Sequence, residues 1–526
     1  MTSKYDVIIV GGGHNGLVAA TYLARGGRRV LVLERRPLVG GACVTEETFP
    51  GFKVSTASYV NSLFRPQIIR ELELAKHGLE ILERSPSSFT PMKDGRSLFF
   101  WPDAQKTIDS IAQFSRKDAE AFPKYEAMLE RIADTIEPTL DMPPPDPSDT
   151  SLGNLWTLLK FAMRMRPLTG QLDDVMRLFM APARTVLEDW FESDELRATL
   201  ATDAVIGAWA SPGTPGTGYV LFHHVMGETN GKRGVWGYVR GGMGALSEAL
   251  ASSARAAGVE ILTDAPVAEI RVESGEVRGV ALENGDSYDA PVVASNLDCY
   301  QTFERLMNPN HLPDDFRKKI KKIRYDSGSC KINVALSELP DFRAIPGTES
   351  APHHRGTIHI APNLDDMDRG FFEATQGKTS TAPVIECTIP STVDETLAPE
   401  GKHIMGIFTQ YTPYELAEGS WDTERDIFAD RVFDIINEYA PNFRDSVIDR
   451  QVLAPPDLES MLGLTGGNIF QGAMTLEQLF FMRPALGYAD HYTPIKGLFL
   501  CGAASHPGGG VMGACGRNAA LVMLKD

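Results

Sequence analysis

Long apolar runs are missing from this chain of 526 residues. No stretch of about eighteen consecutive apolar residues occurs, which excludes an obvious membrane-spanning helix. The first residues, MTSKYDVIIVGGG, also lack the charged segment and long apolar segment of a secretory signal peptide. We therefore expect neither a signal peptide nor a membrane-spanning helix.

Paired cysteines and a surplus of basic residues are missing too. The six cysteines, at positions 43, 299, 330, 387, 501 and 515, form no C-x-x-C pair. The sequence therefore indicates neither a thioredoxin-like redox site nor a zinc site. The formal net charge is -18, whereas nucleic-acid-binding proteins need a basic surface for the phosphates. These absences favour a reducing, cytoplasmic setting and argue against DNA or RNA as a partner.

Glycine, in contrast, is abundant, and its first cluster follows a short apolar stretch. YDVIIV is typical of a buried parallel strand, and it leads directly into GGGHNG, a G-x-G-x-x-G motif. Gly11 permits the turn, Gly13 lets backbone approach a pyrophosphate, and Gly16 lets the next helix pack on the strand. The following strand, RRVLVLE, ends at Glu34, which can accept hydrogen bonds from ribose hydroxyls and would repel a 2′-phosphate. This order predicts a dinucleotide-binding α/β unit, with Asn15 as a further loop contact.

A glycine pair comes directly after this unit. In RRPLVGG, four residues separate Arg35 from Gly40 and Gly41. An NAD dehydrogenase has no need for a second close approach of backbone here. A longer dinucleotide does, because its second phosphate and ribityl chain must pass this loop. The spacing therefore favours FAD.

The largest cluster lies near the other end of the chain, where residues 497–524 contain seven glycines. The stretch TPIKGLFLCGAASHPGGGVMG predicts a turn, a short buried strand, a glycine loop, and a helix from Val511 onward. A strand, a glycine loop and a helix N-terminus again form a corner that suits an anion or a closely packed ring.

These motifs resemble those of the amine-oxidase and phytoene-desaturase superfamily of flavoproteins. The R-x-x-x-x-G-G element, GGMGALSEALA before APVAEI, GGNIFQGAMTLEQLFFMRP and HPGGGVMGACGRNAA together resemble one branch of the phytoene-desaturase family. That branch contains O-type β-carotene ketolases and pyridine-nucleotide-disulphide oxidoreductase domain-containing proteins. The resemblance implies that FAD is the cofactor and that Arg35 contacts the pyrophosphate. Further implied contacts are Gly40, Gly41 and Ala42 near the flavin, Val267 at the adenine, and Gly502, Ala503, Gly510, Val511 and Met512 along the ribityl chain and ring. Many relatives carry an acid where this chain has Ala503.

The resemblance also implies a fold. We expect an α/β protein with a Rossmann-like FAD-binding domain that is discontinuous in sequence, and an α+β substrate domain. The FAD-binding domain would comprise residues 1–75, 235–300 and 485–526, and the substrate domain residues 76–234 and 301–484.

Three histidines are candidates for catalytic chemistry, although the flavin performs the central step in such enzymes. His506 lies in the last glycine loop, where it would tune the flavin or carry a proton, or else brace the loop. His223 and His224 would line the substrate cavity, or else be ordinary packed residues.

Two further segments have alternative interpretations. The aromatic and methionine residues could form an apolar substrate tunnel or ordinary core; they are Trp236, Tyr238, Phe470, Phe480, Phe481 and Met482. The segment LWTLLKFAMRMR, residues 155–166, could lie on a membrane surface or form a core helix with basic ends, and the core helix is favoured.

The leading hypothesis is an FAD-dependent oxidoreductase that takes a hydride from a hydrophobic, polyene or isoprenoid-like substrate and passes electrons to oxygen or a quinone. A flavin-dependent cis–trans isomerase without net oxidation is one alternative. A non-catalytic flavoprotein with a regulatory partner-binding role is another. An amine oxidase is disfavoured because of Ala503. The expected location is the cytoplasm with peripheral membrane contact, or the mitochondrial matrix for a eukaryotic chain.

Overall fold

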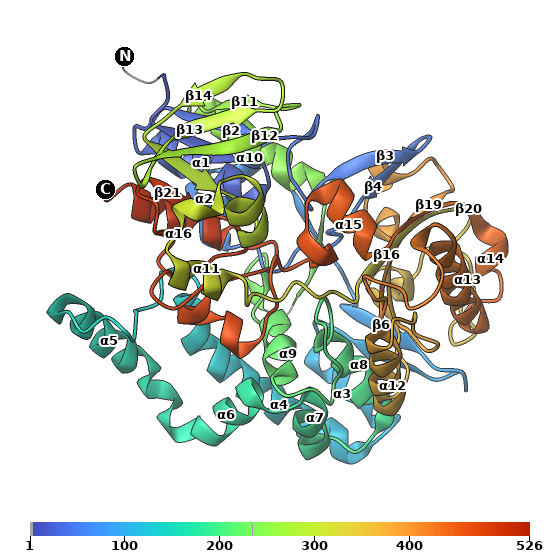
Figure 1. The fold of residues 1–526 in the computed structure, drawn as a ribbon. Coiled ribbons are helices and arrows are strands. Elements are labelled where there is room, and N and C mark those ends of the chain that lie inside the picture. The colour runs from blue at the N-terminus through green and yellow to red at the C-terminus, as the bar shows by residue number, and fades with distance from the viewer. Residues whose placement is uncertain (1–3, 234) are drawn as a thin grey trace.

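A five-stranded parallel sheet carries the first and last parts of the chain in the computed structural model, which describes residues 4–233 and 235–526 (Figure 1). Both faces of the sheet are covered, which is why its strands are almost entirely apolar. In spatial order the strands are β11 (Glu260–Leu262), β2 (Val30–Leu33), β1 (Val7–Val10), β15 (Val292–Ser295) and β21 (Leu498–Leu500).

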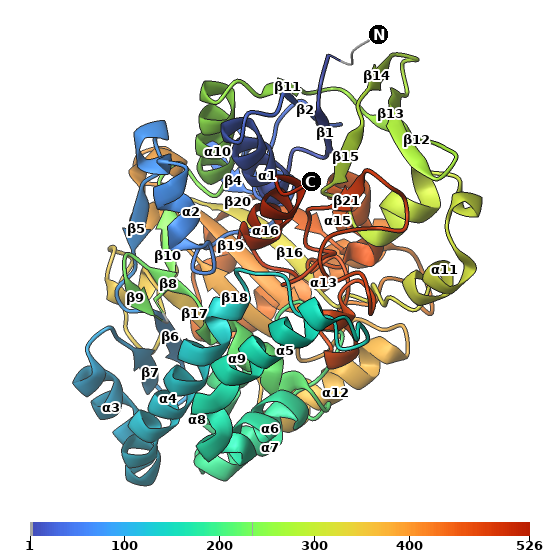
Figure 2. The ribbon, with the colours of Figure 1, turned by 90° about the vertical axis from the view of Figure 1, so that its left-hand side faces the viewer.

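Alternating side chains of β1 face two different layers. Val7 and Ile9 pack with three helices, whereas Ile8 and Val10 pack with a small antiparallel sheet. Figure 2 shows the three helices gathered together beside the strands. The helices are α1 (His14–Arg25), α10 (Gly244–Ala256) and α16 (Ala514–Met523); the small sheet consists of β12 (Val267–Glu273), β13 (Glu276–Leu282) and β14 (Ser287–Asp289).

A seven-stranded mixed sheet lies beside this unit. Helix α13 (Trp421–Tyr439) packs its apolar side chains against one face of that sheet. In spatial order the strands are β20 (Val447–Leu453), β16 (Cys330–Leu336), β19 (His403–Gln410), β18 (Val384–Thr388), β17 (Thr357–Ile360), β6 (Ser88–Pro91) and β7 (Ser97–Phe100).

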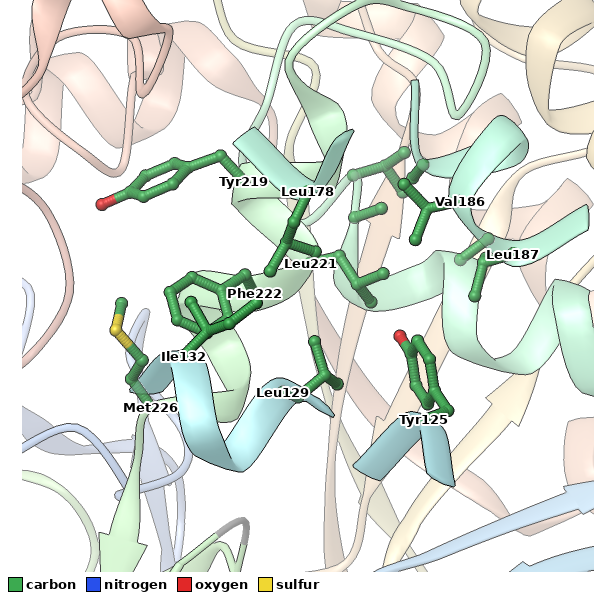
Figure 3. Packing of buried hydrophobic residues seen from close by; sticks show 14 of the residues in the cluster. Tyr125, Leu129, Ile132, Leu178, Val186, Leu187, Tyr219, Leu221, Phe222 and Met226 are labelled. Atoms are coloured by element: carbon green, nitrogen blue, oxygen red, sulfur yellow. The ribbon is translucent and has the colours of Figure 1, made fainter. Parts of the chain in front are cut away.

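A helical lobe closes the molecule below the two large sheets (Figure 1). Its core joins Leu129 and Ile132 of α4 (Arg116–Ile136) to Leu221 and Phe222 of α9 (Thr217–Val225), as Figure 3 shows. Its other helices are α3 (Ala104–Ala112), α5 (Leu152–Met165), α6 (Leu172–Met180), α7 (Ala183–Trp190) and α8 (Asp194–Asp203).

The remaining elements are short or peripheral. They are β3 (Thr45–Phe49), β4 (Phe52–Ser55), β5 (Ile81–Glu83), β8 (Glu228–Thr229), β9 (Lys232–Arg233), β10 (Gly237–Val239), α2 (Pro66–Glu71), α11 (Asp314–Ile320), α12 (Leu364–Thr375), α14 (Phe443–Ser446) and α15 (Pro455–Leu462).

Two local predictions were wrong. The last helix begins at Ala514 rather than at Val511, because Gly510 and Gly513 have φ values of 111° and 73°, in the left-handed region that interrupts a helix. The core-helix interpretation of the segment 155–166 was also wrong, since α5 has no buried residue and lies at the outer edge of the lobe (Figure 1).

The predicted α/β fold class is confirmed: a Rossmann-like unit stands beside a mixed α and β unit. The exact domain boundaries stay a prediction. None of the described helices is long and apolar enough to cross a membrane.

Candidate active site

One continuous cavity of about 960 Å³ connects the two sheets and the helical lobe. Its walls include the loop between β1 and α1, the end of β2, the last glycine loop, the middle of the seven-stranded sheet, and helix α4. A cavity of this size, partly polar and partly apolar, suits a cofactor together with an organic substrate.

The loop between β1 and α1 brings backbone unusually close together. A Cβ on Gly16 would lie 2.4 Å from the carbonyl oxygen of Gly11, and a Cβ on Gly13 would lie 2.7 Å from Nδ2 of Asn296. Helix α1 begins directly after Gly13, and no side chain in the described part of the chain caps its N-terminus. The buried Oδ1 of Asn15 has no hydrogen-bond partner among the described residues. Uncapped helix amides beside a glycine-lined cavity fit a diphosphate.

The carboxylate of Glu34 is fixed at the end of β2. Its Oε2 accepts a hydrogen bond from the backbone N–H of Gly12 at 2.8 Å, and its Oε1 accepts one from the N–H of Arg36 at 2.9 Å. The side chain is buried yet lines the cavity. Each carboxylate oxygen keeps a lone pair for a further donor, which fits recognition of ribose hydroxyls.

Most of the residues predicted to contact the cofactor meet at this cavity. Those that line it are Gly11, Gly13, Asn15, Glu34, Arg35, Gly40, Gly41, Ala42, Val267, Ala503, Gly510 and Val511. Gly16, Gly502 and Met512 lie behind the wall, where Gly16 and Gly502 allow backbone segments to pack closely.

Arg35 has its own protein partners. Its Nη2 donates hydrogen bonds to the carbonyl oxygens of Ser460 and Met461, at 3.2 and 2.8 Å. These carbonyls belong to the last turn of α15, whose negative dipole end favours a cation. Arg35 therefore joins the two sheet regions while it lines the cavity.

The three candidate histidines lie in different surroundings. His506 is buried behind the cavity wall, where its Nε2 is hydrogen-bonded to the carbonyl oxygen of Thr139 at 3.2 Å. His223 is also buried and is not part of the wall. Only His224 of the three lines the cavity; its Nδ1 contacts the carbonyl oxygen of Val220 at 2.9 Å. The geometry thus gives the catalytic assignment of His506 and His223 no support.

The predicted aromatic tunnel is only partly present. Trp236 and Phe470 line the cavity, and Trp236 stacks on the ring of His224. Tyr238, Phe480, Phe481 and Met482 are not part of the cavity wall.

A cluster of buried polar side chains also lines the cavity. The sequence motifs did not indicate this cluster. Glu386 accepts a hydrogen bond from the hydroxyl of Tyr59 at 2.9 Å, and its Oε1 lies 3.4 Å from Nδ1 of His359. The Nζ of Lys331 donates to Oδ1 of Asn333 at 2.6 Å. The sequence does carry one signal for this cluster. The otherwise apolar strands CKINVAL, TIHI and VIECT each contain polar residues, which would have to be buried with the strand.

Burial shifts the pKa values of this cluster strongly. Desolvation, with a contribution from Asp203, raises the pKa of Glu386 to about 8. Desolvation lowers the pKa of His359 to about 3 and that of Lys331 to about 7. At neutral pH, Glu386 is therefore largely protonated and His359 is neutral. Groups with such shifted pKa values in a cavity are typical of functional sites.

Arg483 is a second residue that the motifs alone did not identify. Its buried guanidinium donates to the carbonyl oxygens of Phe470 and Ala503, at 2.7 and 2.9 Å. It donates further to carbonyls of Gly472, Ala473 and Gln478. Arg483 thus fixes two stretches of irregular backbone, one of which carries the last glycine loop.

Comparison with known proteins agrees with this geometry. The chain is 49% identical to the pyridine nucleotide-disulfide oxidoreductase domain-containing protein 2 of Rattus norvegicus, with 99% of this chain and 94% of that protein aligned. It is 26% identical to a limonene dehydrogenase polypeptide of Castellaniella defragrans, over 99% of this chain and 94% of that polypeptide. It is 23% identical to the lycopene-forming phytoene desaturase of Pantoea ananas, over 98% and 99%.

A solved structure shares the fold. The triple mutant of putrescine oxidase superposes with a TM-score of 0.63 over 99% of this chain and 98% of that chain, at 16% identity. Residues 16–523 match the family described as flavin containing amine oxidoreductase. The predicted family resemblance is confirmed, and so is the predicted cofactor, FAD. This chain therefore belongs to the flavin-containing amine oxidoreductase family and is an FAD-dependent oxidoreductase.

Proposed function

We propose that this protein removes hydrogen from a hydrophobic, isoprenoid-like substrate. The observation that carries the proposal is the apolar wall of the cavity where it enters the helical lobe. The side chains of this wall include Phe100, Phe122, Tyr125, Leu129, Leu200, Leu221, Ile469 and Phe470. A wall of this kind favours a hydrocarbon body and excludes water from it.

The chain's own residues would bind and orient the reactants. The glycine loops and Glu34 would hold FAD, which supplies the redox chemistry by accepting a hydride. Phe122 and Leu129 would position the hydrocarbon. Glu386, protonated at neutral pH, would offer the substrate a neutral hydrogen-bond donor, and Lys331, whose pKa burial lowers to about 7, would accept the proton released when the hydride leaves.

Two relatives support the substrate class. One is named as part of a limonene dehydrogenase and another as a phytoene desaturase, and both names concern isoprenoid hydrocarbons. A flavoprotein with a purely regulatory role would need only a small, closed cavity around its cofactor. The cavity of this protein is about 960 Å³, which favours an enzyme that also binds a substrate. The likeness to putrescine oxidase is at 16% identity and concerns the fold, so it does not favour an amine substrate.

Anaerobic spectroscopy of the purified holoprotein tests the proposal. We expect limonene, geraniol or geranic acid to decrease the oxidised-flavin absorbance, with NADPH and putrescine as comparisons. Admission of air or of a soluble quinone then identifies the electron acceptor from the rate of reoxidation. Bleaching by putrescine alone, or conversion of an isoprenoid to its geometric isomer without net oxidation, would contradict the proposal.

We also propose that α5 contacts the surface of an anionic membrane. Its exposed apolar side chains include Leu155, Trp156 and Leu159. Basic Lys160 and Arg164 lie on the same helix, although the whole chain has a net charge of -18. Helix α5 contacts α4, which forms part of the cavity wall. This arrangement suits a helix that rests on a bilayer close to a lipophilic substrate.

Vesicle sedimentation tests the membrane contact. We expect the double variant Leu155→Glu and Leu159→Glu to lose most of its binding to vesicles of phosphatidylcholine and phosphatidylglycerol, because two charges would enter the apolar surface. The matched control is Phe372→Glu, since Phe372 is exposed on α12, far along the chain from α5. Equal sedimentation of the double variant and the wild type would exclude α5 as the contact.

A further inference from the structure

We propose that the substrate carries a carboxylate group and that Arg84 binds it within the cavity. The proposal rests on the proposed function, because it names the polar end of the same hydrophobic substrate. Arg84 follows β5 and lines the cavity beside the seven-stranded sheet. Its side chain is 2% exposed, so its charge is removed from bulk water.

The hydrogen bonds of Arg84 leave donors for a ligand. Its Nε donates to the carbonyl oxygen of Trp236 at 3.1 Å, and its Nη1 donates to Oγ1 of Thr357 at 2.7 Å. A guanidinium has five N–H donors, so these two bonds and the side-chain interaction with the Tyr238 hydroxyl leave two for a ligand. Planar pairs of N–H groups match the two oxygens of a carboxylate.

No carboxylate of the described residues forms an ion pair with Arg84. The partly buried Arg65, in contrast, pairs with Glu137 at 2.6 Å and with Asp141 at 2.8 Å, and the buried Arg483 donates to five backbone carbonyls. A buried cation without a counter-ion is costly, and an anionic ligand would offset that cost. The cation–π contact with Tyr238, at 5.2 Å, stabilises the charge without neutralising it.

The acidic groups near Arg84 form no ion pair with it among the described residues, and burial disfavours their charged forms. Burial raises the pKa of Glu386 to about 8, and burial also raises the pKa of Asp203. His359 is neutral, because burial lowers its pKa to about 3. Lys331 adds positive charge when protonated. This part of the cavity therefore favours an anion over an ammonium group.

The two parts of the cavity together define the chemistry of the ligand. The apolar wall suits a hydrocarbon body, and Arg84 suits one carboxylate at its end. A plain hydrocarbon would leave the guanidinium unpaired, and an amine would place a second cation beside it. The inferred substrate class is thus an amphipathic isoprenoid carboxylic acid.

Binding of a matched series to the dithionite-reduced holoprotein, kept anaerobic, tests the inference without turnover, because a reduced flavin accepts no hydride. Geranic acid, geraniol and geranylamine share one skeleton and differ in the head group. We expect geranic acid to bind about ten- to a hundredfold more tightly than geraniol, because a hydrogen bond to a charged group is added. Isothermal titration calorimetry measures the affinities.

Arg84→Gln should lose that preference and bind geranic acid no better than geraniol. Arg84→Lys should keep part of it, because the charge remains and the planar fork does not. The matched control is Arg240→Gln, which removes an exposed arginine paired with Glu80 and should keep the preference. Retained geraniol binding shows that each variant has an intact cavity.

Three results would overturn the inference. They are equal binding of geranic acid and geraniol to the wild type, tighter binding of geranylamine, and an unchanged acid preference in Arg84→Gln. If neither Arg84 variant folds, the affinities of the wild-type protein for geranic acid, geraniol and geranylamine decide whether the inference holds. Failure of every isoprenoid to bleach the flavin would instead contradict the proposed function. The binding comparison does not depend on that result, because it measures affinity and not turnover.

Discussion

Gly13→Val should purify with at least about tenfold less flavin than the wild-type protein. The new side chain would meet Asn296, because even a Cβ at this position lies 2.7 Å from Nδ2 of that residue. Asn296 cannot move freely, since its Nδ2 donates to the carbonyl oxygen of Gly11 at 3.2 Å. The substitution would also fill the space beside the N-terminus of α1 that suits the diphosphate.

The ratio of flavin absorbance to protein absorbance measures the effect. Gly170→Val is the matched control, because a Cβ on Gly170 meets nothing within 4 Å. Circular dichroism distinguishes loss of cofactor from loss of fold. Normal flavin content in a folded Gly13→Val protein would refute the assignment of this loop to the phosphates.

Arg483→Gln should destabilise the holoprotein by about 3 kcal/mol or more, because buried carbonyls lose charge-assisted hydrogen bonds. The guanidinium bonds five carbonyl oxygens, including those of Phe470 and Ala503. Burial lowers the pKa of Arg483, and the carbonyl dipoles around it stabilise the charge that remains. Loss of these bonds would release the last glycine loop, so weaker FAD retention should accompany the lower stability.

Thermal unfolding followed by flavin fluorescence measures both effects at once, because released flavin fluoresces. The control is Arg324→Gln, whose half-exposed side chain pairs with Asp326. A pair of this kind contributes at most about 1 kcal/mol, so that variant should unfold close to the wild-type temperature. Equal unfolding temperatures for Arg483→Gln and Arg324→Gln would show that Arg483 does not fix the loop.

The cofactor half of the site could be predicted because its determinants are local. Gly11, Gly13, Gly16 and Glu34 act through the turn of the chain and through backbone, so their spacing alone carries the information. The same holds for Gly40, whose φ of 124° is incompatible with most side chains. Helix ends were predicted less well, as the late start of α16 shows, because competing glycine conformations decide where a helix begins.

The substrate half could not be predicted in this way. Arg84, His359 and Glu386 lie on or directly after separate strands, and each by itself could be a surface residue. His506 and His223 stand in suggestive motifs, yet both are buried and neither is part of the cavity wall. Side-chain direction depends on which face of a strand or helix is buried, and distant segments decide that.

The sequence by itself determined the family, the cofactor and the α/β unit that binds it, because strands, glycine turns and helix starts are written in contiguous residues. Only the tertiary structure decided which polar side chains meet in the cavity and which of them lack a counter-ion. Charge compensation and desolvation arise from all neighbours in space, and for Arg84 and Glu386 those neighbours lie more than a hundred residues away in the chain.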